Sequence, residues 1–173
     1  MPSIQCTRTL WRRLDRATRV RERVPERIFQ GVVLGNWIAK MFRYDKRELV
    51  IALDERTYAV VLFPLSPRYH FRPHFAAALA GLLEDLGVPA SVVAQECAAI
   101  QFAPLTRLDS SPVLETLSHA QYLCELDLFD MSDLRDIQLH VNDYPHAAGP
   151  APCAIEALAE IFAPALVRRC VRH

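Results

Sequence analysis

The sequence predicts an α+β fold, in which an antiparallel three-stranded meander is extended into a small mixed sheet with helices packed on it. Three observations support this class. Three apolar runs separated by short charged turns fill residues 36–63. Apolar residues then recur at helical spacing after residue 70. A further short run near the start can join the same sheet, so one layer of sheet with helices on it is the simplest arrangement.

The first element expected is a short strand over residues 3–6. Thr7 or Thr9 can then cap a helix that extends through Leu14. The segment that carries this helix is the most charged part of the chain.

The meander is expected at residues 36–44, 48–53 and 57–63, with turns at 45–47 and 54–56. Runs of this length that are rich in Val, Ile, Tyr and Phe are typical of antiparallel strands. The second run is apolar on both faces, which predicts a central position. The first run alternates between two faces, which carry Trp37, Ala39 and Met41 on one side and Ile38, Phe42 and Tyr44 on the other.

Two helices are expected next. The spacing of Phe75 through Leu86 predicts the first, and Gly87 stands where a left-handed cap is needed. Pro89 suits the first position of the second helix. Residues 100–103 are interpreted as a strand.

Three more elements complete the prediction. Ser111 and Pro112 open a helix that carries Leu114, Leu117 and Cys124. Residues 137–141 alternate between apolar and polar side chains, which predicts a half-buried strand. Residues 155–166 form a final helix, which Pro164 should kink or split.

The length of 173 residues fits a single domain over residues 1–173. The formal net charge is zero, so a global attraction to nucleic acid or anionic lipid is not expected. No apolar run near Met1 has the form of a signal peptide, and none reaches the roughly 20 residues of a membrane span. The five cysteines are odd in number and scattered. We therefore expect reduced thiols in a cytoplasmic protein that does not enter a membrane.

The N-terminal arginines are the strongest charge feature, and we take Arg8, Trp11, Arg12, Arg13 and Arg16 as candidate partner-binding residues. Eight arginines lie between residues 8 and 27, against three acids in the same segment. Arginines of this kind can neutralise phosphates, and Trp11 can stack on a base. The alternative is a solvated face that pairs with acids elsewhere. Those acids are Glu115, Glu125, Asp127, Asp130, Asp133 and Asp136.

Asn36 and Trp37 are the remaining candidates for partner binding. Gly35 permits close approach to the strand, and Trp37 offers a large flat surface with one donor. These two residues can line a groove for a ligand or partner. The favoured alternative places Trp37 in the core.

No motif predicts a catalytic residue, a metal site or a cofactor. His70 and His74 have the spacing of a metal pair, but Pro73 lies between them. His140 and Asp143, with His146, form a second weak cluster. Cys124 and His119 are five positions apart, which points them in different directions on a helix. The sequence has neither a nucleophile elbow nor a glycine-rich phosphate loop.

Several short motifs resemble a family of small, mostly bacterial proteins of unknown function. These motifs are residues 4–10, 34–40, 44–47, 54–57 and 111–118. The chain departs from the family pattern at Pro112 and Glu115, and Ser118-His119 stand where the family more often has Asn-Asp. The resemblance extends from Ile4 to about Pro145. It implies a compact intracellular domain and supplies no activity.

The leading hypothesis is a non-catalytic binding protein that acts by protein–protein contact, including self-association. A mobile-element, defence or antitoxin-like setting is a guess from the small size, and no residue shows it. The first alternative is nucleic-acid binding through the arginine-rich helix. The second is a small enzyme whose site is assembled from Asn36, Trp37, Asp45 and His140.

Overall fold

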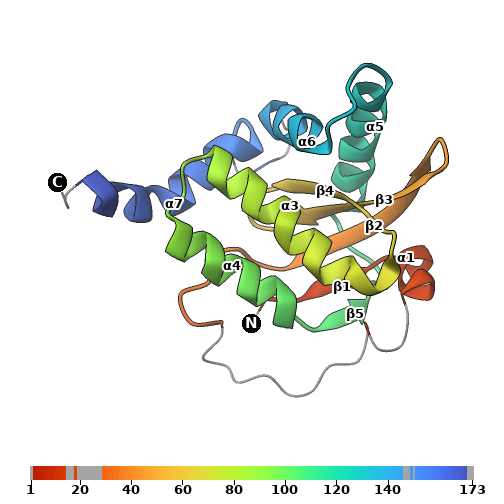
Figure 1. The fold of residues 1–173 in the computed structure, drawn as a ribbon, viewed down its shortest axis with the longest axis horizontal. Coiled ribbons are helices and arrows are strands. Elements are labelled where there is room, and N and C mark those ends of the chain that lie inside the picture. The colour runs from red at the N-terminus through yellow and green to blue at the C-terminus, as the bar shows by residue number, and fades with distance from the viewer. Residues whose placement is uncertain (1, 15–17, 19–28, 146–148, 150, 171–173) are drawn as a thin grey trace.

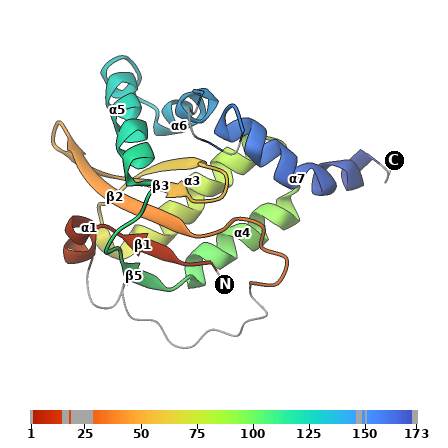
Figure 2. The ribbon, with the colours of Figure 1, turned by 180° about the vertical axis from the view of Figure 1, so that it is seen from behind.

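The computed structural model describes residues 2–14, 18, 29–145, 149 and 151–170, with backbone only at 69 and 164–170 (Figures 1 and 2). Five strands form one sheet in the order β4-β3-β2-β1-β5. The strands are β1 (Ile4–Cys6), β2 (Trp37–Tyr44), β3 (Arg47–Asp54), β4 (Val60–Pro64) and β5 (Leu105–Arg107). β2, β3 and β4 pair antiparallel, whereas β1 runs parallel to both β2 and β5. The predicted mixed α+β sheet is confirmed.

Helices cover both faces of this sheet (Figures 1 and 2). The helices are α1 (Arg8–Arg13), the short 3-10 helix η2 (Arg68–His70), α3 (Phe71–Asp85), α4 (Ala90–Phe102), α5 (Leu114–Asp130), α6 (Leu134–Asp143) and α7 (Ala154–Cys170). Buried side chains of α1, α3, α4 and α7 share one apolar cluster with one face of the sheet. Those of α5 and α6 share a second cluster with the opposite face. The sheet is therefore a middle layer, and both faces of its central strands are buried.

The alternation predicted for the meander is present in the structure. Trp37, Ala39 and Met41 contact the first cluster, while Ile38 and Phe42 lie in the second. The hairpin between β2 and β3 closes with Tyr44 opposite Arg47. β3 is apolar toward both clusters, as expected for the middle strand of the meander.

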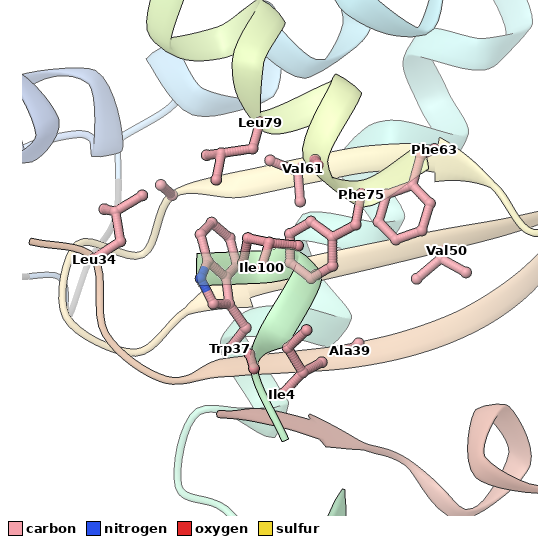
Figure 3. Close-up of a cluster of buried hydrophobic side chains, with 14 of the residues drawn as sticks. Ile4, Leu34, Trp37, Ala39, Val50, Val61, Phe63, Phe75, Leu79 and Ile100 are labelled. Carbon is pink, nitrogen blue, oxygen red and sulfur yellow. The ribbon is translucent and has the colours of Figure 1, made fainter. Parts of the chain in front are cut away.

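The first cluster centres on aromatic rings. Trp37 meets the edge of Phe75 at a centroid distance of 5.1 Å, and Phe63 stacks on Phe75 at the same distance (Figure 3). Edge-to-face and stacked rings of this kind add a specific geometry to the burial of apolar surface. They fix α3 against β2 and β4.

The end of α3 follows the sequence prediction. Gly87 has a φ of +72°, and its amide donates to the carbonyl of Glu84 at 2.9 Å. The next amide, of Val88, donates to Leu83 at 3.0 Å, which completes a left-handed cap. Pro89 precedes the first residue of α4 instead of occupying it.

The strand predicted at residues 100–103 is wrong. α4 continues to Phe102, and the strand β5 begins at Leu105. Val93, Glu96 and Ile100 are all buried, and their spacing is helical. An apolar run of four residues cannot by itself distinguish a buried helix end from a strand.

The strand predicted at residues 137–141 is also wrong, because this segment lies in α6. Asp133 caps the helix by accepting a hydrogen bond from the amide of Arg135 at 2.7 Å. Ile137 and Val141 are buried at a spacing of four. Asp136 and His140, two of the three polar residues that suggested an exposed strand face, are indeed exposed on this helix, but the third is not. Gln138 and, four residues further on, Asn142 are both buried.

These two residues form what we call the amide clamp, Gln138 and Asn142, on the free edge of β4. Asn142 accepts from the amide of Val60 and donates to its carbonyl, both at 2.7 Å. Gln138 accepts from the amide of Leu62 at 2.8 Å and donates to Ala78 in α3 at 2.9 Å. The side chains thus replace a neighbouring strand, and the edge of β4 is not available for pairing.

The final helix runs unbroken from Ala154 to Cys170, so Pro164 does not split it. Thr7 stands just before α1, but its hydroxyl makes no capping hydrogen bond to a described residue. Within the described ranges, no helix combines the length and the apolar character needed to cross a bilayer.

Candidate functional site

The structure describes four of the five N-terminal candidates. Arg8 and Arg12 are exposed on α1, and Trp11 is half-buried against the first apolar cluster. Arg16 lies outside the described residues, as do the other predicted arginines of this segment at positions 19, 21, 23 and 27. Arg8 and Arg12 are therefore accessible cations on a short helix.

Arg13 forms an ion pair with Glu48 on β3, and two more arginines approach the same carboxylate. Arg43 donates to the Glu48 Oε1 atom at 2.9 Å, and the Arg68 Nη2 atom lies 3.9 Å from Oε2. The acids of α5 and α6 that were considered as partners lie elsewhere: within the described chain none of them pairs with these arginines. Glu48 is the observed counter-charge.

Trp37 is a core residue. Its side chain is only 1% exposed and lies among Leu34, Val61 and Phe75 (Figure 3). The groove hypothesis therefore fails for Trp37, and the favoured alternative is confirmed. Asn36 accepts hydrogen bonds from the amide and hydroxyl of Ser3, at 3.2 and 3.0 Å, which joins β1 to β2.

Asn36 also borders a cavity of about 620 Å³. Its lining comprises Pro2, Phe29, Gln30, Val32, Leu34, Gly35 and Asn36. The loop behind it is held by two buried carboxylates. Asp54 accepts from the amide of Gly35 at 2.8 Å, and Glu96 accepts from the amide of Val33 at 2.7 Å.

The two carboxylates titrate abnormally because both are buried. Desolvation raises the pKa of Asp54, although hydrogen bonds from Thr57 and from backbone amides oppose the shift. Desolvation raises the pKa of Glu96 to about 7, against two backbone hydrogen bonds and with a smaller contribution from the charge of Asp54. Both carboxylates accept hydrogen bonds from backbone amides, and Asp54 accepts one more from the Thr57 hydroxyl, so they support the loop over residues 33–36.

The residues of the proposed enzyme site do not converge. Asn36 and Asp45 flank opposite ends of β2, which at about 3.3 Å per residue separates them by roughly 30 Å. His140 belongs to α6, where its Nδ1 lies 2.8 Å from a carboxylate oxygen of Asp127 and its ring contacts Tyr144. The structure therefore gives no support to a catalytic centre built from these four residues.

The metal and thiol candidates also lack an assembled site. The rings of His70 and His74 meet edge to face at 5.6 Å, and His74 Nδ1 lies 2.8 Å from the carbonyl of Pro64. Over the described residues, no three His, Cys, Asp or Glu side chains gather into a metal-binding group. Burial raises the pKa of the Cys6 and Cys124 thiols to about 12, so they remain protonated at neutral pH.

The feature that sequence reasoning missed is a second apolar face on α5. Tyr122, Leu126 and Phe129 are 56%, 50% and 84% exposed. Their spacing of four and three residues places them in one stripe along the helix. The buried face of the same helix carries Leu117, Ala120, Leu123, Cys124 and Leu128. Apolar side chains on two opposite sides of this helix offered the signal in the sequence, because one layer of sheet can cover only one of its faces.

A family model for a domain of unknown function, DUF6933, matches residues 3–153. The chain belongs to the DUF6933 family. This agrees with the resemblance to a family of unknown function. A search of curated proteins found no match.

The structure gives the short motifs of this DUF6933 domain a physical role. The 34–40 motif and the 54–57 motif meet at Asp54, whose carboxylate binds the amides of Gly35 and Thr57. The Thr57 hydroxyl donates to the same carboxylate at 2.8 Å. These residues join the turn between β3 and β4 to the segment that enters β2, so their chemistry serves the fold. The exposed side chains on α5, in contrast, belong to neither apolar cluster of the described residues.

Proposed function

We propose that this protein is a non-catalytic protein-binding domain and that it binds its partner through the stripe Tyr122, Leu126 and Phe129, the α5 stripe. The observation that supports this is the exposure of two aromatic rings and a leucine along one side of a well-packed helix. Single exposed apolar residues are ordinary, but contiguous patches of this kind are typical of interaction sites. Aromatic side chains are also enriched in the centres of interfaces.

The size of the α5 stripe suits the anchor of one partner helix. With 150 to 250 Å² for each aromatic side chain, the exposed fractions correspond to roughly 350 Å² of mostly apolar surface. This is the scale of a functional patch on a monomer. Residues on a partner helix at a spacing of three and four would match the rows of the stripe.

The charges around the α5 stripe favour a basic partner. α5 contains four acids and neither lysine nor arginine; the acids are Glu115, Glu125, Asp127 and Asp130. Asp133 and Asp136 follow at the start of α6. An amphipathic helix with lysine or arginine beside its apolar face would complement this rim. Two copies of α5 packed against each other would instead bring like charges together.

A pair of synthetic peptides tests this proposal. A helical peptide of Leu and Lys and its Leu and Glu counterpart are labelled, and their binding is measured by fluorescence anisotropy at several salt concentrations. We expect the protein to bind the Lys peptide and not the Glu peptide. Phe129→Ser and Tyr122→Ser should each weaken binding at least tenfold, which corresponds to a loss of about 1.4 kcal/mol or more.

Thr106→Ala, at an exposed position on β5, serves as the control and should bind like the unaltered protein. Equal binding of both peptides, or binding that survives Phe129→Ser and Tyr122→Ser, would overturn the proposal. Sedimentation of the protein alone tests whether a second copy of the protein covers the α5 stripe. A dimer that dissociates in Phe129→Ser would mean that a second copy, and not a basic helix, binds there.

A further inference from the structure

Three arginines from separate elements converge on one carboxylate at the end of the sheet. Arg13 comes from α1, Arg43 from β2 and Arg68 from η2. All three guanidinium groups approach Glu48, whose side chain is 15% exposed. We call Arg13, Arg43 and Arg68 the arginine triad. The fold brings these residues together from positions up to 55 apart in the sequence, so no local motif reveals the group.

The charges of the arginine triad are incompletely balanced. Three positive charges face the single negative charge of Glu48, and within the described chain no other carboxylate lies within ion-pair distance of them. Desolvation and the positive charges of Arg68 and Arg43 lower the pKa of Arg13. The crowding of like charges is thus a property of the folded protein, and an added anion would relieve it.

The arginine triad also has more hydrogen-bond donors than Glu48 can accept. Each guanidinium carries five N–H groups, whereas the two oxygens of Glu48 accept only a few of them. Arg43 and Arg68 are both exposed, and Glu48 lies deeper than either. Planar guanidinium groups arranged in this way match the oxygens of a tetrahedral oxyanion.

We propose that the arginine triad is a binding site for a phosphate group, with Glu48 holding the three side chains in position from beneath. The site is separate from the α5 stripe, because it is built from α1, β2, β3 and η2. The phosphate can belong to a small phosphorylated molecule or to the backbone of a nucleic acid. The exposed Arg8 and Arg12 on α1 would extend the contact for the second source.

Isothermal titration with inorganic phosphate and pyrophosphate, and anisotropy with a labelled single-stranded oligonucleotide, test the site at constant ionic strength. Arg43→Gln and Arg68→Gln are the informative variants, because these exposed side chains can be replaced without opening the core. Each should weaken binding about tenfold, the loss expected for one charge-assisted hydrogen bond. Arg107→Gln is the matched control, an exposed arginine on β5 that pairs with Asp109, and it should change affinity by less than about twofold.

The three ligands distinguish the two sources. Binding of phosphate or pyrophosphate that Arg43→Gln weakens supports a small phosphorylated ligand. Binding of the oligonucleotide alone, weakened in the same way, supports a nucleic-acid backbone. Failure of all three ligands to bind overturns the proposed site. It is also overturned if Arg43→Gln and Arg68→Gln bind with the same affinity as Arg107→Gln.

Discussion

Replacing Asn142 of the amide clamp by alanine should strongly destabilise the protein. The Asn142 side chain makes three hydrogen bonds, two with the backbone of Val60 and one to the carbonyl of Gln138 at 2.8 Å. Asn142 and Val60 are both fully buried. Alanine would leave the amide and the carbonyl of Val60 without partners at the edge of the sheet, while the rest of α6 stays in place.

The size of the effect follows from these two orphaned groups. An unsatisfied buried donor or acceptor costs about 1 to 3 kcal/mol. Water can reach part of the space that the amide leaves, so the cost should fall below the sum of the extremes. We expect the free energy of unfolding to decrease by about 3 kcal/mol. In a domain of this size that lowers the melting temperature by roughly 6 to 12 °C.

Urea unfolding followed by circular dichroism measures this change. The midpoint should fall while the m-value stays constant, since the exposed surface on unfolding is unchanged. Asp143→Ala is the matched control, because Asp143 is the next residue of α6 and is exposed; its effect should stay within about 0.5 kcal/mol. If Asn142→Ala costs no more than Asp143→Ala, the reasoning about the edge of β4 is refuted.

Three further changes test the buried carboxylates and the glycines. Burial raises the pKa of Glu96 from 4.5 to about 7. Its contribution to the free energy of unfolding is therefore complete below pH 4.5 and is lost as the pH rises from 4.5 through 7. The free energy of unfolding should therefore decline over this range, by roughly 3 kcal/mol at most, and Glu96→Gln should flatten the decline; an unchanged slope would contradict the assignment. Every one of the four hydrogen bonds of Asp54 is accepted by its carboxylate, and Asp54→Asn replaces one acceptor oxygen by a donor. This change should lower the free energy of unfolding in urea by about 2 kcal/mol, while Asp45→Asn in the exposed hairpin turn should lower it little. A methyl group at Gly87 would have no atom within 4 Å, but the backbone there keeps a positive φ, so Gly87→Ala should lower the melting temperature by the equivalent of about 1 kcal/mol. Gly81→Ala, inside α3, should be neutral or stabilising, and equal shifts for the two variants would argue against backbone strain at Gly87.

The sequence patterns identified the elements whose signal is local. The meander over β2, β3 and β4 follows from apolar runs and polar turns, and Gly87 marked the end of α3 because only a left-handed residue completes that cap. α6 was assigned wrongly because Gln138 was taken to face water together with Asp136 and His140. Gln138 and Asn142 are buried as partners of β4, and this depends on a strand about 80 residues earlier.

The candidate site was predictable only in part. The core position of Trp37 agrees with the interpretation that the sequence favoured, whereas the sequence left open whether Arg8 and Arg12 are exposed. The convergence of Arg13, Arg43 and Arg68 on Glu48 depends on three elements that meet only in the folded chain. The exposure of Phe129 depends on which face of α5 the sheet covers.

The sequence by itself determined the α+β class, the meander and the ends of several helices, because hydrophobic period, turn residues and caps act within a few positions of one another. Only the tertiary structure decided which polar groups are buried and which apolar groups remain in water. Those outcomes depend on partners that are distant along the chain, such as Asn142 for Val60 and Glu48 for Arg13. The α5 stripe is left exposed for the same reason, since the one sheet in the described chain has already buried the opposite face of that helix.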